Sequence, residues 1–485
     1  MAFLYQQIAE ELGAKIQNGE FNFDQKIPSV RAMAQKMNCS HSVVIQAYEF
    51  LEKNGLIYAV PKSGYFPQIQ NHTLTVSDMQ VKKSPNKLKA IAPSTHLMIA
   101  KVLEASLNPQ IAPLGGGIPS PEILPLQTLQ KFLVRASRDW TELLGIYTPT
   151  LGSLNLRKQI AKLMHQRGVE VDPEEILITN GCMEALVLAL RACTQKGDVV
   201  ALEYPLFFGL ISVLEDLELK VVQIKTHPQT GLDLEHFKKA LDRHSVRVLV
   251  SSATLQNPLG FSTSSEHKKS LVDLCKKNKV TLIEDDVYGE CLFQPELIRP
   301  LKHYDQSQNV IYCSSFSKTT CPGYRIGWMI AGKKHTQVTR AKMSQTLGGS
   351  SLIQEAMTLF LEEGCYEYHI KKFRKAIASQ LFQYRQLILD TFPKNTKVSS
   401  PQGGFFLWVE LPEELQINTA KLFDRAILEC EVSFVPGPTF CAEWSDNNQS
   451  LHPLNSCLRI SCGVPLTPEI KAKVLALGQF FDSQK

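Results

Sequence analysis

Long apolar runs are absent from this 485-residue sequence: no stretch reaches the roughly 18 residues that a membrane-spanning helix needs. Its 12 cysteines lack CxxC pairs and histidine companions, which argues against a metal site or a disulfide framework. Neither sign of charge is in large excess, because 52 Lys and Arg oppose 47 Asp and Glu. Glu10 and Glu11 interrupt the N-terminal apolar pattern, so we expect no signal peptide and a reducing, cytoplasmic location.

The chain is long enough for more than one domain, and its pattern of apolar and polar residues changes clearly along its length. Residues 1–69 form a small module, residues 70–108 are a polar and basic linker, and residues 109–485 alternate strand and helix patterns. Nearly continuous apolar runs predict strands buried on both faces at residues 199–205, 246–253, 280–286 and 309–315. The alternation predicts an α/β fold with a doubly wound, mainly parallel sheet, and residues from about 355 to 485 form a smaller α/β part.

The residue pattern of the N-terminal module predicts three helices and a β-hairpin. Apolar residues of the first helix recur four apart, at Leu4, Ile8, Leu12 and Ile16. Ser29 can cap a second helix running through Met37, and Ser40 a third running to about Lys53. Residues 58–66 then supply two short β runs around a turn, which is typical of a wing.

This module resembles the GntR-type winged helix-turn-helix, and the likeness covers residues 1–67. The matching residues are Pro28, Ser29, Val30, Arg31, Ala34, Ser40, Ala47, Tyr48, Leu51, Glu52, Gly55, Leu56, Ile57, Ser63, Gly64, Tyr65 and Phe66. From Lys26 to Tyr48 there are basic residues and no acid, as phosphate contact requires. The alternative is a winged helix that contacts only protein.

The resemblance implies which side chains of this module face DNA: Ser29, Arg31, Ser40, His41, Lys62 and Gly64. Residues 40–43, Ser42 among them, would read bases in the major groove. His41 and Val43 depart from the Arg and Thr usual in the family, which leaves the base preference open.

A lysine directly follows the predicted strand at residues 309–315. Lys318 has Ser315, Ser317 and Arg325 close by, which are groups suited to a phosphate. The run resembles the S-x-S-K and P-x-x-R-x-G motif of fold-type I aminotransferases, which implies that Lys318 holds pyridoxal 5′-phosphate (PLP) as an aldimine. The alternative is a solvated loop lysine.

The strand at residues 280–286 ends in three consecutive acids. The D-x-x-Y spacing of Asp285 and Tyr288 resembles the family's partners of the pyridine nitrogen and ring oxygen. Glu284 and Asp286 are rivals, but strand alternation directs both to the face opposite Asp285. We therefore assign Asp285 to the pyridine nitrogen and Tyr288 to the ring oxygen.

Further motifs resemble the rest of a cofactor and substrate site. Asn257 in an N-P-x-G turn would donate to the PLP phenolic oxygen and border the substrate. A helix N-terminus would cradle the phosphate through Gly181, Cys182 and Met183, although the family more often has a hydroxyl or amide side chain in this turn. Phe207 would stack on the pyridine ring, with Phe208 as the second candidate, and both could instead be core aromatics.

Two more residues extend the resemblance. Tyr147 is similar to the tyrosine that reaches the phosphate of the neighbouring subunit, which implies a homodimer. Arg459, in an otherwise apolar strand, is similar to the arginine that clamps a substrate carboxylate.

The whole chain resembles the MocR family of bacterial regulators, in which a GntR-type module precedes an aminotransferase-like body. The resemblance implies a PLP-dependent transcriptional regulator of double-stranded DNA, whose effector is an amino compound, sensed as an aldimine at Lys318, or PLP itself. The second hypothesis is an active aminotransferase with an accessory DNA-binding module, in which Lys318 also serves as general base.

Overall fold

The computed structural model describes residues 4–17, 26–53, 56–60, 64–67, 88–93, 97–295, 298–442 and 452–484. The chain divides into two compact units, Met1–Asp78 and Met79–Lys485. Within the described residues, no helix has the length and apolar character to cross a membrane.

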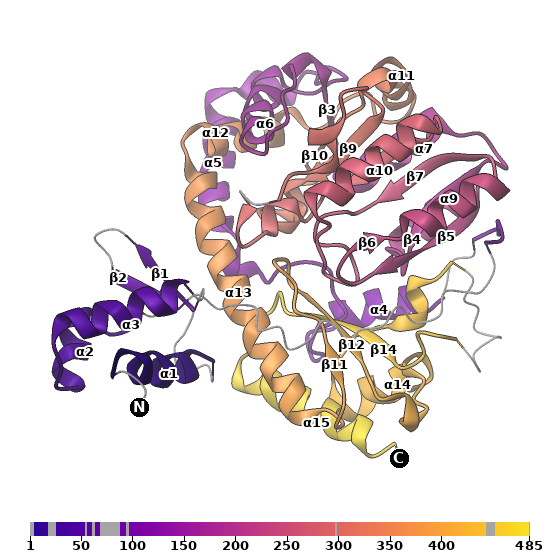
Figure 1. The fold of residues 1–485 in the computed structure, drawn as a ribbon. Helices are drawn as coiled ribbons and strands as arrows, with labels where there is room; N and C mark the ends of the chain where they lie inside the picture. Colours follow the sequence, from indigo (N-terminus) through magenta and orange to yellow (C-terminus); the bar gives the residue numbers. More distant parts are fainter. Residues whose placement is uncertain are drawn as a thin grey trace. The chain divides into compact units, whose positions relative to one another are not determined.

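The first unit has the predicted winged arrangement (Figure 1). It consists of α1 (Leu4–Gln17), α2 (Val30–Lys36), α3 (His41–Lys53), and the antiparallel strands β1 (Ile57–Val60) and β2 (Gly64–Pro67). Ile8, Leu12 and Ile16 are buried as predicted, whereas Leu4 is 45% exposed because it begins the helix beyond the core. The Ser29 hydroxyl caps α2 by accepting from the Ala32 N–H at 3.2 Å.

The second unit is built on a mixed sheet of eight strands in the order β3-β10-β9-β8-β7-β4-β5-β6. Its strands are β3 (Ile176–Thr179), β4 (Val199–Tyr204), β5 (Lys220–His227), β6 (Gly231–Leu232), β7 (Val246–Ser251), β8 (Thr281–Asp285), β9 (Val310–Ser315) and β10 (Gly327–Ile330). The neighbours from β9 through β8, β7 and β4 to β5 are parallel, whereas β10 and β6 run antiparallel to their neighbours. The predicted mainly parallel sheet is therefore confirmed.

Helices cover both faces of this sheet, which explains why its strands are almost wholly apolar. Val200 and Leu202 of β4 pack in the core on the side of α7 (Cys182–Cys193) and α8 (Gly209–Asp216). Ala201, between them, packs in the core on the side of α9 (Leu234–Arg243) and α10 (Ser265–Lys277). The remaining helices of the unit that flank the sheet are α5 (Leu126–Asp139), α6 (Leu154–Gln166), α11 (His335–Gln345) and α12 (Ser351–Glu362).

The smaller part of the second unit has its own antiparallel sheet in the order β11-β12-β14-β13. Its elements are α13 (Cys365–Thr391), β11 (Lys397–Val398), β12 (Phe406–Glu410), α14 (Thr419–Cys430), β13 (Val435–Pro436), β14 (Cys457–Ser461) and α15 (Pro468–Asp482). The two strands expected here, β12 and β14, are adjacent and antiparallel.

Part of the expected linker belongs to this core. Residues 97–107 form α4 (Leu97–Leu107), and its Met98, Val102 and Ala105 are buried against the smaller sheet's cluster. The boundary between the units lies after Asp78. The linker expected over residues 70–108 therefore includes a helix that packs on the second unit.

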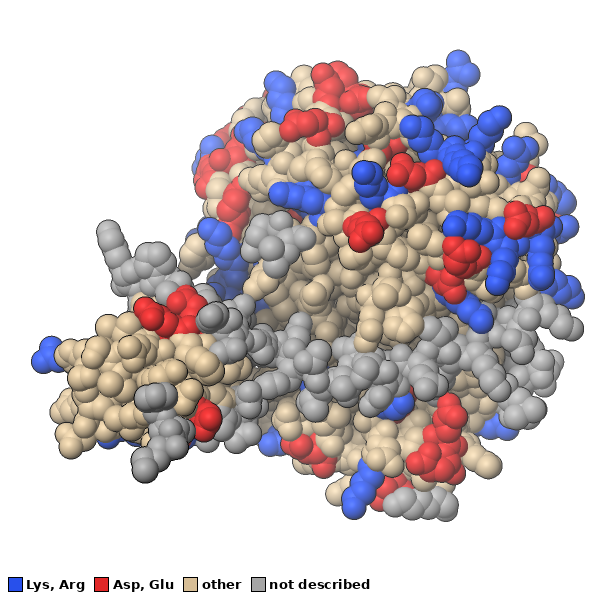
Figure 2. Space-filling model, in the orientation of Figure 1, with Lys and Arg blue, Asp and Glu red and all other residues tan. Residues whose placement is uncertain are grey.

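Charges of both signs are interspersed over the face of the second unit that Figure 2 shows. Lys and Arg crowd most at the upper right of this view, and Asp and Glu lie among them.

Candidate functional site

A cavity opens at the carboxyl ends of the central strands, where open α/β sheets place their ligands. Most residues that the sequence assigns to the cofactor line it. The lining residues are Cys182, Met183, Leu186, Phe207, Ser252, Asn257, Asp285, Val287, Tyr288, Ser315, Ser317, Lys318 and Arg325.

Lys318 ends the short 3-10 turn Phe316–Lys318 that directly follows β9. Its Nζ donates to the Gly117 carbonyl oxygen at 2.6 Å and lies 5.6 Å from the centre of the Tyr288 ring. Burial, with Arg459 adding to it, lowers the pKa of Lys318 to about 8. A buried amine of this kind gives up its proton more readily than a surface lysine, as a nucleophile requires.

Asp285 is the last residue of β8 and the one acid of its run that lines the cavity. Glu284 instead accepts from the N–H groups of Leu301 and Lys302 at 2.6 and 2.8 Å. Asp286 accepts from Arg167 and from the Tyr312 hydroxyl, away from the cavity lining. The strand alternation used to choose among the three acids therefore matches their positions.

Asp285 is only 6% exposed, and the loss of hydration is the main influence on the pKa of its carboxyl group. Burial raises the pKa of its carboxyl to about 6, against an ordinary value of 3.8. A carboxylate held in such a place favours a cationic partner, since a positive charge would offset the lost hydration.

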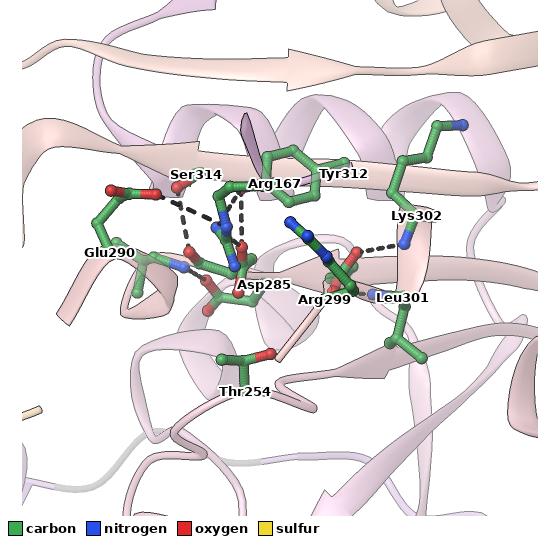
Figure 3. Close-up of polar contacts among 12 residues, drawn as sticks. Arg167, Thr254, Asp285, Glu290, Arg299, Leu301, Lys302, Tyr312 and Ser314 are labelled. Carbon is green, nitrogen blue, oxygen red and sulfur yellow. Dashed lines mark hydrogen bonds and ion pairs between the residues drawn. The ribbon is translucent and has the colours of Figure 1, made fainter. Parts of the chain in front are cut away.

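Buried charges behind the site fix the strand end that carries Asp285 (Figure 3). Arg167 pairs with Asp286 and approaches Glu290 at 3.6 Å, and its Nη1 donates to the Tyr312 hydroxyl at 3.2 Å. Arg374 donates to the Glu290 carbonyl and carboxylate at 2.8 and 3.2 Å. None of these residues lines the cavity, so this network supports the site from outside.

The phosphate side of the cavity combines the start of α7 with Arg325. Gly181 has φ 80°, a backbone conformation that other residues rarely adopt, and it lies directly against the Arg325 guanidinium, so the position favours glycine. Arg325 donates to the Asn180 carbonyl at 3.0 Å and to the Ser317 hydroxyl at 3.4 Å. The Gly181 N–H donates to the Thr179 carbonyl at 2.9 Å. The backbone donors for a ligand therefore come from the first turn of α7.

The remaining serine of the lysine motif also lies in the cavity wall. The Ser315 hydroxyl accepts from the Ser317 N–H at 3.2 Å. Hydroxyl, guanidinium and helix N-terminus thus converge on one side of the cavity, which suits a dianion.

Arg459 and Asn257 form a second polar group beside the cavity. Arg459 is 2% exposed, and its Nη1 donates to Asn257 Oδ1 at 2.9 Å. Its Nη2 donates to the carbonyls of Gly115 and Gly116 at 2.9 and 3.3 Å, while its Nε is buried without a hydrogen-bond partner in the described structure. Burial lowers the pKa of Arg459 to about 10, which indicates a cation short of negative partners.

Of the two candidate stacking rings, Phe207 lines the cavity. Phe208 instead packs edge-on against Phe440, 5.5 Å between ring centres, and lies 5.8 Å from the Arg459 guanidinium. Tyr288 is buried between Phe405 and Phe406, and burial raises its pKa well above the ordinary range, so its hydroxyl stays protonated.

Other predicted residues lie outside this cavity. Tyr147 is 87% exposed and does not line it. In the first unit the expected DNA-facing residues that the structure describes are all exposed: Ser29, Arg31, Ser40, His41, Ser42 and Gly64. Lys62 lies outside the described residues.

Sequence reasoning missed two groups at the site. The Gly117 carbonyl holds Lys318, and the run of glycines at residues 115–117 was the available signal. Glu203 lies buried beneath the cavity wall and accepts from the Ser251 hydroxyl at 2.6 Å and the Ser252 N–H at 3.2 Å. It adjoins the aromatic run that supplies Phe207, but its burial was not evident from spacing.

These residues fit PLP. A lysine, a buried carboxylate in need of a cation, an arginine with a buried unpartnered nitrogen, and a glycine turn beside Arg325 face or border one cavity. Together the fold and the cavity define a fold-type I PLP-binding protein that also carries a winged helix-turn-helix.

Comparison with known proteins agrees with this class. Residues 126–471 match the family aminotransferase class I and II, and residues 4–66 match the bacterial regulatory proteins of the gntR family. The chain is 35% identical over 447 residues to the HTH-type transcriptional regulator YdcR of Escherichia coli, covering 91% of this chain and 93% of that protein. It is 31% identical over 475 residues to YjiR of the same organism, covering 98% of both.

A solved structure provides a third comparison. LysN, an α-aminoadipate aminotransferase from Thermus thermophilus complexed with N-(5′-phosphopyridoxyl)-L-leucine, is 27% identical with a TM-score of 0.71, over 80% of this chain and 95% of LysN. The chain therefore belongs to the aminotransferase class I and II family and, within it, to the MocR-type regulators that join a GntR-family module to such a body. It is a DNA-binding transcriptional regulator with PLP as its cofactor, as the sequence predicted.

Proposed function

We propose that the second unit senses a small amino compound at Lys318 and that this binding changes how the winged helices engage operator DNA. The effector would carry an amine, to compete with Lys318 for the cofactor, and a carboxylate, to reach Arg459. PLP, when bound, supplies an aldehyde that condenses with amines and a ring that withdraws electrons.

The uncharged hydrogen-bond acceptors of two buried basic side chains carry this proposal. Lys318 donates to the Gly117 carbonyl, and Arg459 donates to Asn257 and to the Gly115 and Gly116 carbonyls. All these acceptors are uncharged, so the Arg459 guanidinium remains available to a carboxylate and the Lys318 amine to a carbonyl group. A purely structural buried arginine or lysine is ordinarily paired with a carboxylate, as Arg167 and Lys342 are here.

The other side chains around the cavity bind different parts of the cofactor. Asp285 holds the pyridine nitrogen, Tyr288 and the Asn257 amide hold the ring oxygen, and Phe207 covers the ring. Ser315, Ser317, Arg325 and the first turn of α7, with Gly181, Cys182 and Met183, hold the phosphate. Each of these residues lines the cavity except Gly181, which lies against Arg325 and so keeps the turn close to that side chain.

A homodimer completes the proposal. Tyr147 is exposed rather than packed, and Leu144 and Ile146 beside it are 65% and 57% exposed. Exposed apolar residues grouped in this way favour a contact with another copy, to whose phosphate Tyr147 would extend. Two winged modules would then be presented together to DNA.

Binding of the full chain to the DNA upstream of its own and neighbouring genes tests this function. We expect sequence-specific binding whose strength changes when PLP-loaded protein is titrated with amino acids or polyamines, together with a change in visible absorbance. Binding that is absent, or that never responds to PLP or amines, would contradict the proposal.

Aminotransferase activity is the second candidate, and one observation favours it. The lowered pKa of Lys318, about 8, makes its amine a usable proton acceptor near neutral pH. Sustained conversion of an amino acid and 2-oxo acid pair by the purified chain would support catalysis. A single exchange without turnover would favour sensing alone.

A further inference from the structure

Cys182 contacts a different part of the site from the one its sequence position indicates. The residue begins α7, in the turn expected to cradle the phosphate. Its thiol instead lies 3.4 Å from Oδ1 of Asp285, to which it donates a hydrogen bond across 103 positions of sequence. Cys182 is 8% exposed and lines the cavity together with Asp285.

The two carboxylate oxygens of Asp285 are consequently unequal. Oδ1 accepts from the Cys182 thiol at 3.4 Å and from the Val287 N–H at 3.3 Å. Within the described structure, Oδ2 has no hydrogen bond. Two donors on one oxygen fix the rotation of the carboxylate and leave the other oxygen available to a ligand in the cavity.

A thiol suits this task because it remains neutral. Burial, reinforced by Asp285, raises the pKa of Cys182 well above the ordinary thiol range, so the group keeps its proton and can only donate toward the carboxylate. A lysine or arginine at this position would neutralise Asp285, whereas a neutral donor orients it and leaves its charge for the pyridine ring.

We propose that Cys182 is a positioning residue for the cofactor: its thiol holds Oδ1 of Asp285, so that Oδ2 is presented to the pyridine nitrogen. This inference rests on the proposed function, in which Asp285 is the partner of that nitrogen. It assigns to the Cys182 side chain a role separate from the phosphate contact of its backbone.

Several titratable groups face Asp285 and set the expected pH dependence: Cys182 on α7, Glu203 on β4, Cys313 on β9, Lys318 after β9, and Asp286 and Tyr288 on its own segment. The Cys182 hydrogen bond, the Val287 N–H and Lys318 all favour the ionised carboxylate. Loss of the Cys182 hydrogen bond would raise the Asp285 pKa further. As the pH is lowered, PLP binding would then begin to weaken at a higher pH than in the wild type.

The test compares full-length, cofactor-free wild type with Cys182→Ala, which lacks the donor, and Cys182→Ser, which retains one. PLP affinity and the visible spectrum are measured by absorbance titration at several pH values around the Asp285 pKa of about 6. Cys275→Ala is the matched control, because Cys275 is a fully buried thiol on α10 and lies outside the cavity lining.

We expect Cys182→Ala to bind PLP about three- to tenfold more weakly, the worth of one hydrogen bond, with its acid limb moved to higher pH. Cys182→Ser should retain the acid limb of the wild type and lose no affinity, and Cys275→Ala should match the wild type in both respects. If Cys182→Ala does not fold, Cys182→Val, which fills the space of the thiol with an apolar group and has no donor, replaces it.

Two outcomes overturn the inference: an unchanged affinity and acid limb in Cys182→Ala, or an equal loss in Cys182→Ser, which would indicate packing rather than hydrogen bonding. A wild-type protein that binds no PLP would instead refute the proposed function. The two failures are therefore distinguishable.

Discussion

Arg459 donates a hydrogen bond from Nη1 to Oδ1 of Asn257 at 2.9 Å, which joins β14 of the smaller sheet to the turn that follows β7. Among the described residues the Asn257 side chain is engaged only through its oxygen, so its NH₂ group is available to an acceptor in the cavity. One residue thus links the proposed carboxylate clamp to the proposed contact with the cofactor's ring oxygen.

Replacement of Arg459 should separate recognition of the carboxylate from recognition of the amine. In Arg459→Gln we expect the response to an amino acid to weaken roughly 10- to 100-fold, because charge-assisted hydrogen bonds are lost. The response to the corresponding amine without a carboxylate should change little. Absorbance titration of PLP-loaded protein measures both, and an equal loss for the two ligands would refute the clamp.

Removal of the Arg31 guanidinium should reduce both DNA affinity and its dependence on salt. Loss of one phosphate contact lowers the slope of log K against log salt by about 0.9. Lys15→Ala is the control, because Lys15 lies on α1 and pairs with Glu11 at 2.7 Å. An unchanged slope in Arg31→Ala, or an equal change in the control, would count against the DNA-facing assignment.

Asp285 should lower the stability of the cofactor-free protein at neutral pH. Burial raises its pKa from 3.8 to about 6, so the folded state binds more protons than the unfolded state within this window, and the stability contributed by this group falls as pH rises through it. Asp285→Asn removes the penalty and should gain about 3 kcal/mol on the wild type above pH ~6, and little below pH ~4.

Denaturant unfolding of cofactor-free protein at both pH values measures this gain. Asp305→Asn provides a control of opposite sign: although burial opposes it, Lys302 and backbone N–H groups lower the pKa of Asp305. That variant should lose stability at neutral pH. A gain for Asp285→Asn that is the same at both pH values would contradict the electrostatic explanation.

The ion pair behind the site should be far more important to stability than a surface pair. Arg167→Met leaves the fully buried Asp286 side chain without its cation, which typically costs about 3–5 kcal/mol. Adding Asp286→Asn should recover much of this loss. Arg135→Met breaks an exposed pair with Glu363 and should cost under about 1 kcal/mol. Equal losses in Arg167→Met and Arg135→Met would contradict the burial argument.

Local features of the chain could be predicted because they depend on neighbouring residues. The Ser29 cap follows from residue type and helix start, and the separation of Asp285 from Glu284 and Asp286 follows from strand alternation. The mainly parallel sheet follows from the repeated alternation of strand and helix, whereas its strand order and the antiparallel β10 and β6 were not predicted.

Contacts between distant segments could not be predicted in this way. Lys318 meets Gly117 across 201 positions, Cys182 meets Asp285 across 103, and Arg167 meets Asp286 across 119. Spacing along the sequence carries no information on such distances. The same reason explains why α4 was not predicted. Its Met98 and Val102 are buried against residues of the smaller sheet, which lie far along the sequence.

The most direct test of the central claim is the visible spectrum of purified wild type and Lys318→Ala after incubation with PLP, with Lys333→Ala as an exposed lysine control. We expect protein-bound absorbance in the wild type and in Lys333→Ala, and its loss in a folded Lys318→Ala. A wild type that stays colourless, or a Lys318→Ala spectrum identical to the wild type, would contradict the central claim.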